Sequence, residues 1–324
     1  MVRVEGLEKR FGRGGLFGRG AQTVAVRDIS FALGEGETLA LVGESGSGKS
    51  TTARLVMRLL APDAGRIEWE GRDVSHLPAR RLRPLRRFIQ MVFQDPFASL
   101  NPRMRIGETV GEGLAIHEPQ LSRTERRRRV AEALERCGLD PDAMDRYPHQ
   151  FSGGQRQRIG IARALIVKPR VLVLDEPVSA LDVSVQAQIL NLLAEIQREQ
   201  GLSYLFISHD LSVVRHVADR VAVMYAGRIV ELAPAESLFG NPRHPYTQAL
   251  LDARPAISPA DRKEVPDEPM PELHAQPAAS GCPFRSRCPR AVDACASTAP
   301  ALSEDAHAHA CLNPLPEGHQ SGAR

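Results

Sequence analysis

The sequence predicts an α/β fold in which helices cover a parallel sheet. Strand-like and helix-like segments alternate over the first 235 residues, as a sheet with helical crossovers requires. The segments 38–42 and 171–174 are apolar runs without alternation, which is typical of strands buried on both faces. The first run leads through a glycine-rich loop directly into a helical pattern.

The remaining elements of the predicted core follow in order along the chain. A helix is expected from Ser50 to about Leu60, where a cluster of turn-forming residues ends it. Later segments with helix or strand character are a helix at about 183–199, a strand at 204–207, and a closing hairpin formed by 221–224 and 228–231.

The middle third of the chain, about 96–165, is predicted to form a helical insertion. A capping-box pattern at 122–125 opens a helix that runs through Cys137. The apolar positions of this helix share one face, so Cys137 is expected in the core. The arginine run at 126–129 is interpreted as a solvated helix face rather than a site for a polyanion.

Length, composition and charge narrow the possible functions. The chain of 324 residues can hold one large domain and a smaller appendage, and its hydrophobic fraction of 42% is ordinary for a globular protein. A net charge of +3 provides no strong field for nucleic acid, so no nucleic-acid partner is expected. Charges occupy the place of a signal-peptide core, and no apolar run approaches the roughly 18 residues of a membrane span. We therefore expect a cytosolic protein.

The strongest motif is G-E-S-G-S-G-K-S at 43–50, which fits G-x-x-x-x-G-K-[S/T] between a strand and a helix. Backbone N–H groups of such a loop can hold phosphates at a helix N-terminus, where the dipole favours anions. Lys49 can reach the β- and γ-phosphates, and Ser50 can bind Mg²⁺. A turn without a ligand is the alternative. The predicted nucleotide-binding residues are Gly43, Glu44, Ser45, Gly46, Ser47, Gly48, Lys49, Ser50 and Thr51.

Two acids, Asp175 and Glu176, follow the second apolar strand. Asp175 is placed to order the magnesium shell, and Glu176, one residue further on, to polarise an attacking water. Solvated turn residues would look the same in isolation. Together with the loop at 43–50, the two acids predict a site for ATP and Mg²⁺.

A second glycine motif, Phe151-Ser-Gly-Gly-Gln155, leads into a helix expected at 155–166. Together with the P-loop, the glycine-rich motif at 43–50, this segment resembles the ABC ATPase family. The signature of that family is usually written LSGGQ, and here Phe151 replaces the leading Leu. The resemblance covers residues 1 to about 235 and implies a RecA-like P-loop NTPase core with an inserted helical subdomain. It also implies a head-to-tail dimer, in which each ATP lies between one P-loop and the partner's signature, here Ser152, Gly153, Gly154 and Gln155.

The same resemblance implies roles for further residues. Gln94 matches the Q-loop glutamine that couples to the membrane partner, and Asp182 lies in the D-loop at the dimer interface. His209 matches the switch histidine and is expected to act in catalysis together with Glu176. The expected adenine-stacking aromatic is Phe11, with Phe17 in the following loop as the other candidate. The magnesium ligands that the resemblance implies are Ser50, Gln94 and Asp175.

The sequence after about residue 235 resembles one subgroup of the family. His244-Pro-Tyr-Thr247 resembles the stretch that follows the ATPase domain in motors of dipeptide and oligopeptide importers, closest to the F-type subunit. This implies a nucleotide-binding domain at 1–235 and an extension at 236–324, part ordered and part linker. It also implies a related D-type ATPase, two membrane permease subunits and an extracytoplasmic substrate-binding protein as partners. The implied location is the cytoplasmic face of the inner membrane.

Four of the five cysteines lie in the last 45 residues with the spacing C-x5-C-x6-C-x15-C. In a reducing compartment such a cluster suggests a metal before disulfides. Zinc sites favour C-x2–4-C pairs, and none is present. The resemblance implies a [4Fe–4S] cluster, and zinc and free thiols are the alternatives. The cluster is expected to be structural, and replacing one of its cysteines is expected to leave the chemistry of the ATP site largely unchanged. His307 and His309 are expected to be solvent-exposed. The four residues are Cys282, Cys288, Cys295 and Cys311.

Other classes are disfavoured. A GTPase needs an N-K-x-D motif, and no asparagine precedes a lysine here. A DNA-repair or chromosome ATPase of the same superfamily would carry a long coiled coil or a zinc insertion, but about 100 residues without heptads separate Ser50 from Ser152. An inactive regulatory subunit is disfavoured because every catalytic position is occupied. The cargo stays open among dipeptides, longer peptides, nickel chelates and glutathione-like compounds.

Overall fold

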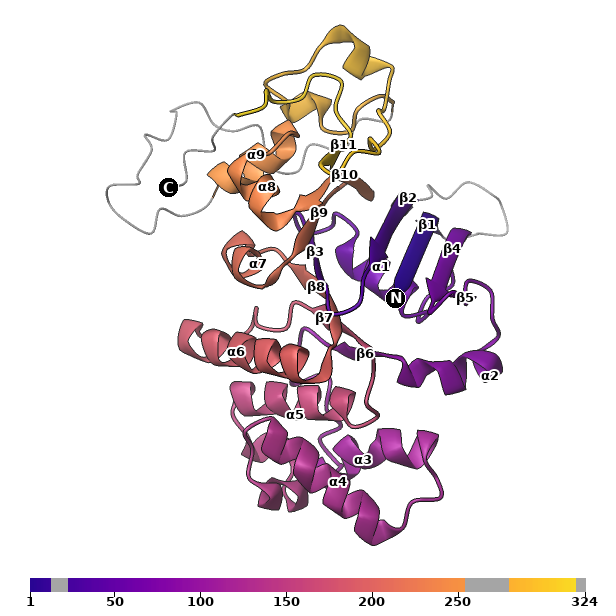
Figure 1. The fold of residues 1–324 in the computed structure, drawn as a ribbon, viewed down its shortest axis with the longest axis vertical. Helices are drawn as coiled ribbons and strands as arrows, with labels where there is room; N and C mark the ends of the chain where they lie inside the picture. The colour runs from indigo at the N-terminus through magenta and orange to yellow at the C-terminus, as the bar shows by residue number, and fades with distance from the viewer. Residues whose placement is uncertain (13–22, 254–279, 319–324) are drawn as a thin grey trace.

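A seven-stranded sheet runs through the middle of the molecule (Figure 1). The computed structural model describes residues 1–12, 23–253 and 280–318; Phe17 and most of the predicted linker lie outside these ranges. Strands β9, β3, β8, β7 and β6 are mutually parallel, which confirms the predicted fold, while β10 and β11 continue the sheet in antiparallel pairing. The strands are β3 (Thr38–Val42), β6 (Ile89–Val92), β7 (Val171–Asp175), β8 (Ser203–Ser208), β9 (Arg220–Tyr225), β10 (Arg228–Pro234) and β11 (Ala308–His309).

Both faces of the sheet are buried, which explains the apolar runs. In β3, Ala40 and Val42 belong to a core shared with the helices on one face, whereas Leu39 and Leu41 belong to a second core on the other. Successive strand residues point to opposite faces, so a strand between two cores must be apolar throughout. The helices are α1 (Lys49–Val56), α2 (Ala79–Leu82), α3 (Ile106–His117), α4 (Arg123–Arg136), α5 (Gly153–Leu165), α6 (Val183–Gln200), α7 (Leu211–Val217), α8 (Ala235–Gly240) and α9 (Pro245–Asp252).

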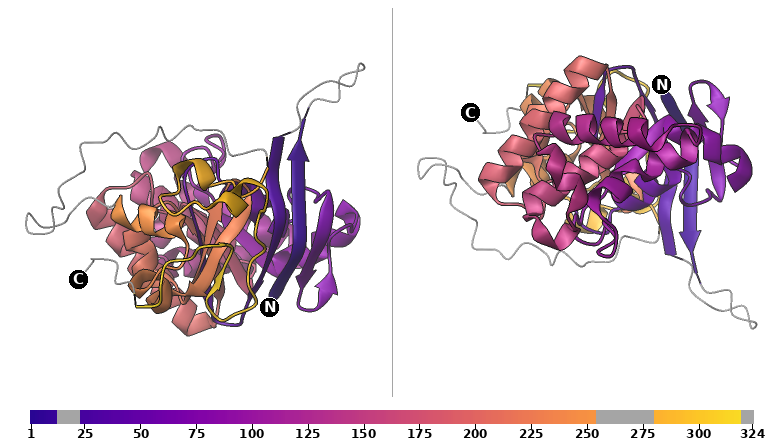
Figure 2. Two further views of the ribbon diagram at one scale, coloured as in Figure 1. Left: turned by 90° about the horizontal axis from the view of Figure 1, so that it is seen from above. Right: turned by 90° about the horizontal axis from the view of Figure 1, so that it is seen from below.

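The second core is closed by α1 and by a separate antiparallel sheet of order β2-β1-β4-β5 (Figure 2). The sequence indicated only short β-like runs before residue 40, but two long strands with irregular register form there. Helix α1 also stops earlier than expected, because Arg58 adopts a left-handed φ of 52° and its N–H bonds to Leu55 O at 2.8 Å. The strands of this sheet are β1 (Val2–Phe11), β2 (Thr23–Leu33), β4 (Ala64–Trp69) and β5 (Arg72–Asp73).

Helices α3, α4 and α5 form the end of the molecule opposite the C-terminal extension (Figure 1). The Ser122 hydroxyl caps α4 by accepting the Glu125 N–H at 3.1 Å, as predicted. Cys137 is fully buried, and burial raises the pKa of its thiol to about 12, so it is core, as expected. Most of the arginine run forms ion pairs, namely Arg127 with Asp145, Arg128 with Glu125 and Arg129 with Glu118.

The extension is anchored on a buried carboxylate in β10. Glu231 is fully buried and accepts the backbone N–H groups of Arg243 at 2.7 Å and His244 at 2.9 Å. His307 Nε2 lies 2.7 Å from Glu231 Oε1, and His309 pairs with Glu231 across β10 and β11. The two histidines are therefore half-buried, and the expectation that they are exposed was wrong. The domain boundary at residue 235 stays a prediction.

We predict that Glu231→Ala lowers the free energy of unfolding by about 2–4 kcal/mol, because it leaves two buried N–H donors without an acceptor. Chemical denaturation of the purified chain measures this. The matched control is Glu317→Gln, which removes an exposed partner of Arg243 and should change stability by less than about 0.5 kcal/mol. Equal effects of the two substitutions would contradict the anchoring role of Glu231.

Candidate active site

The loop between β3 and α1 needs glycine at two positions. Gly43 has φ +148°, and a Cβ there would lie 2.2 Å from Met224 O. Gly48, the N-cap of α1, has φ +105°, and a Cβ there would lie 2.5 Å from Ala25 O. Only a residue without a Cβ allows the loop to approach β9 and β2 this closely. The predicted P-loop therefore wraps over the N-terminus of α1.

Two polar side chains of the loop fit an anionic ligand. Lys49 is buried, and its Nζ donates to Gly43 O at 2.8 Å and to Glu44 O at 2.9 Å. Burial lowers the pKa of Lys49, while the nearby carboxylates, including Glu176, oppose this shift. The buried Ser47 Oγ has no hydrogen-bond partner among the described residues. A buried cation and an unsatisfied hydroxyl at a helix N-terminus are what a phosphate requires.

The end of β7 faces the start of α1. Ser50 Oγ donates to Asp175 Oδ1 at 3.1 Å, and burial raises the pKa of Asp175, an effect that the Ser50 hydroxyl opposes. Mg²⁺ is commonly held by one or two protein oxygens together with phosphate oxygens. The hydroxyl and the carboxylate are therefore a fitting protein donor set for Mg²⁺ bound with a nucleotide.

Glu176 is the point at which three predicted motifs meet. Gln94 Nε2 donates to Glu176 Oε2 at 2.7 Å, and His209 Nδ1 lies 3.2 Å from Glu176 Oε1. Glu176 has a left-handed φ of 47°, held by its N–H bond to Ile207 O at 3.0 Å. A non-glycine residue in this region stores strain and is often functional. The carboxylate is thus fixed between an amide and an imidazole, as a water-orienting group requires.

The signature segment faces outward and packs on α6. The exposed Ser152 caps α5 by accepting the Gln155 N–H at 3.3 Å. A Cβ at Gly154 would lie 2.5 Å from Val185 Cγ1, so glycine permits the contact between α5 and α6. Asp182 caps α6 by accepting the Val185 N–H at 3.0 Å. Ser152, Gln155 and Asp182 are exposed, and within the described residues their side-chain hydrogen bonds stay at the N-termini of α5 and α6 and do not reach the P-loop.

Phe11 lies at the end of β1 and is 43% exposed, with Lys9 Nζ 5.8 Å from its ring centroid. An exposed ring can stack on a base, so Phe11 fits the expected role. Thr51 is half-buried in the first turn of α1. Both assignments stay predictions.

Comparison with known proteins identifies the family. Residues 26–179 match the family described as ABC transporter, and residues 230–295 match the family described as oligopeptide/dipeptide transporter, C-terminal region. A putative peptide import ATP-binding protein of Brucella ovis is 51% identical over 318 residues, which cover 96% of this chain and 97% of the relative. The chain belongs to the ABC transporter ATP-binding proteins.

Further relatives and solved structures similar to this ABC ATPase belong to the same family. The oligopeptide transport ATP-binding protein OppF of Salmonella typhimurium is 50% identical, over 89% of this chain and 87% of the relative. A dimeric post-hydrolysis state of the ATP-binding cassette MJ0796 bound to ADP and Pi has 30% identity and a TM-score of 0.66, covering 72% of this chain and 99% of that one. The cassette cbiO1 of Clostridium perfringens has 32% identity and a TM-score of 0.64, covering 74% and 90%. The resemblance to ABC ATPases is thereby confirmed.

The four C-terminal cysteines of the ABC ATPase gather in one region without forming a ligand cage. The Cys282 N–H donates to Cys295 O at 2.9 Å. Burial raises the pKa of Cys282, Cys288 and Cys311, the last to about 11, and the neighbouring cysteines add to each shift. Within residues 1–12, 23–253 and 280–318, however, no group of three or more histidine, cysteine, aspartate or glutamate side chains is arranged to hold a metal. The thiols are near enough to influence one another's pKa, but in this arrangement no three of them surround one metal position.

Sequence reasoning missed one group of contacts at the P-loop. The extension's Arg287 forms a bidentate ion pair with Glu44, at 2.8 and 3.0 Å, and the Glu44 N–H donates to Tyr246 Oη at 3.0 Å. No local pattern signals a contact between residues 243 positions apart. The expectation that a cysteine substitution leaves the chemistry of the ATP site largely unchanged stays a prediction. Separately, none of the helices in the described ranges is long and apolar enough to cross a membrane.

We predict that Glu176→Gln leaves ATP binding intact and slows hydrolysis by roughly 10²–10⁴-fold, because it removes the predicted general base. Steady-state phosphate release and nucleotide titration measure the two effects. Glu35→Gln, at an exposed carboxylate paired with Arg170, is the matched control and should leave turnover unchanged. Near-normal turnover of Glu176→Gln would reject the assignment.

Proposed function

We propose that this ABC ATPase hydrolyses ATP to power the import of dipeptides or oligopeptides. The observation that carries the proposal is the pair of matches in one chain, an ABC cassette and the C-terminal region of oligopeptide/dipeptide transporters. The relatives named for peptide import and for oligopeptide transport, at 51% and 50% identity, support the same cargo class.

The proposed chemistry assigns each group at the site one task. Backbone N–H groups of the P-loop and the Lys49 ammonium bind the phosphates of the substrate ATP. Ser50, Asp175 and Gln94 are the proposed protein ligands for Mg²⁺, which supplies positive charge at the phosphate oxygens when bound. Glu176 orients the attacking water and accepts its proton, and His209 contacts the γ-phosphate.

The proposed assembly is a head-to-tail pair of ABC ATPases. Ser152, Gln155 and Asp182 are exposed, and the neighbouring Val183 is 81% exposed at the start of α6. The N-termini of α5 and α6 suit the phosphates of a partner's nucleotide. The exposed apolar side chain of Val183 suits a contact with the partner protein. A D-type paralogue is the proposed partner, and a second copy of this chain is the alternative. Two permease subunits and an extracytoplasmic substrate-binding protein would complete the importer at the cytoplasmic face of the inner membrane.

We predict that a strain lacking this chain loses uptake of labelled dipeptides or oligopeptides. The wild-type chain should restore uptake, whereas Glu176→Gln, expressed at the same level, should not, because transport needs hydrolysis. Uptake of nickel chelates and of glutathione is measured in parallel. If the wild-type chain restores uptake of one of these compounds but not of peptides, that compound replaces peptides as the proposed cargo. Full restoration of uptake by Glu176→Gln would refute the motor function.

We further propose that the four C-terminal cysteines hold one [4Fe–4S] cluster, with zinc as the alternative. The support is chemical, since four neighbouring thiols are a suitable donor set, although their present arrangement would have to tighten around the cluster. The cysteine-containing part of the extension, residues 280–318, contributes few buried apolar side chains, and a small segment with little core often depends on a metal. Its buried apolar residues are Phe284, Cys295, Ala308, Ala310 and Leu315.

We predict that anaerobically purified protein is brown and contains about four irons per chain. Cys288→Ser should bleach it and make the tail more sensitive to proteolysis, whereas Cys137→Ser, in the helical subdomain, should keep the colour. Iron and zinc analysis of both variants measures this. Colourless protein with one zinc per chain would establish the zinc alternative, and metal-free protein with a protected tail would contradict both.

A further inference from the structure

The P-loop of this chain is contacted by the C-terminal extension through one bidentate ion pair. Arg287 Nη1 donates to Glu44 Oε2 at 3.0 Å, and Nη2 donates to Oε1 at 2.8 Å. The Arg287 side chain is 7% exposed and the Glu44 side chain 22%, so water screens the pair only weakly. Planar bidentate pairs of this kind fix the orientation of the carboxylate as well as its charge.

The arginine is itself held in place by aromatic side chains. Its guanidinium lies 5.6 Å from the Phe284 ring centroid and 5.9 Å from that of Tyr225. Tyr246 packs against both rings, with its ring centroid 4.6 Å from that of Tyr225 and 5.3 Å from that of Phe284. Stacking on rings in a buried setting limits the motion of the guanidinium. Arg287 therefore presents a fixed positive charge to the P-loop.

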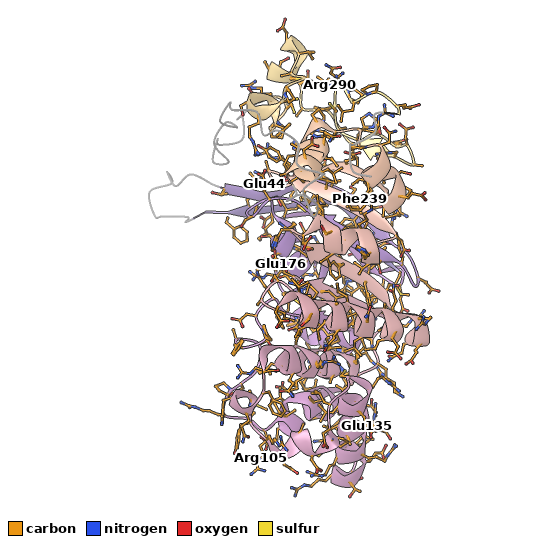
Figure 3. All side chains as sticks on the ribbon, turned by 90° about the vertical axis from the view of Figure 1, so that its left-hand side faces the viewer. Glu44, Arg105, Glu135, Glu176, Phe239 and Arg290 are labelled. Carbon is orange, nitrogen blue, oxygen red and sulfur yellow. The ribbon has the colours of Figure 1, made fainter. Side chains whose placement is uncertain are left out.

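Glu44 is held at all three of its polar groups. Arg287 binds the carboxylate, Tyr246 Oη accepts the backbone N–H, and Lys49 Nζ donates to the backbone carbonyl. Two of these three partners belong to the chain beyond residue 235. Figure 3 labels Glu44 close to the extension and above Glu176. The shape of the loop therefore depends on the extension as well as on β3 and α1.

The charge of Glu44 makes this contact relevant to ligand binding. An unpaired carboxylate in the P-loop would repel the phosphates that Lys49 attracts, and in a partly buried site such repulsion is not fully screened. Arg287 offsets the charge and turns the carboxylate toward the extension.

We propose that Arg287 is a positioning residue for nucleotide binding, which neutralises and orients Glu44 so that ATP affinity depends on the C-terminal extension. This inference rests on the proposed function, in which the P-loop binds ATP. A purely structural alternative is that the ion pair only fastens the extension to the core.

The test is equilibrium binding of a fluorescent ATP analogue with Mg²⁺ to the full-length chain. Arg287→Ala should weaken binding by roughly 3- to 10-fold, with maximal turnover nearly unchanged, and Arg287→Lys should lose less because it keeps the charge. Adding Glu44→Gln to Arg287→Ala should recover much of the affinity, because it removes the unpaired charge. The defect of Arg287→Ala should shrink as salt is raised.

The matched control is Arg285→Ala. Arg285 lies in the same turn, Arg285–Arg287, but donates to Ala296 O within the extension and does not touch the P-loop. This control should bind ATP as the wild type does. The proposal is overturned if Arg287→Ala binds normally, if Arg285→Ala loses as much affinity, or if Glu44→Gln fails to rescue. A wild-type chain that binds no nucleotide would instead refute the proposed function.

Discussion

The parallel register of β3, β8 and β7 is the constraint on which the site depends. Val42 pairs with Ser208, and Asp175 pairs with Ile207, so the three strands end within one residue of one another. The residues that follow them, in the P-loop, at His209 and at Glu176, consequently leave the sheet at the same edge, where α/β proteins bind ligands. A register change of one residue would separate these groups by about 3.3 Å, which is more than a hydrogen bond tolerates.

The charges at this edge are stabilised by one another and by the backbone. Burial disfavours the charged forms of Lys49 and Asp175, and the hydrogen bonds to Gly43 O and from Ser50 offset only part of that cost. Phosphate oxygens and a divalent cation would give both groups stronger, charge-assisted partners. The site is therefore arranged so that binding a nucleotide relieves an electrostatic cost already present in the fold.

The core and the ATP site were predictable because their signals are local. A strand between two cores is apolar throughout, and the P-loop needs glycine at Gly43 and Gly48 for steric reasons that leave a visible motif. The long β1–β2 pairing was missed because irregular register blurs the alternation of its residues. The roles of His307 and Arg287 were missed for a different reason. Their partners lie 76 and 243 positions away, and no short pattern encodes such a contact.

The cysteine-containing part of the extension, residues 280–318, is joined to the core at two places, which changes how its cysteines are understood. Near residue 308 this segment adds β11 to the core sheet beside Glu231. Near residue 287 it forms an ion pair with Glu44 of the P-loop. The turn that presents Arg287 lies between Cys282 and Cys288, and the Cys282 N–H is bonded to Cys295 O. Whatever constrains these thiols therefore also constrains the arginine. A structural role for the cysteine segment is thus not separate from ATP binding, because Arg287 of this segment holds Glu44 of the P-loop in place.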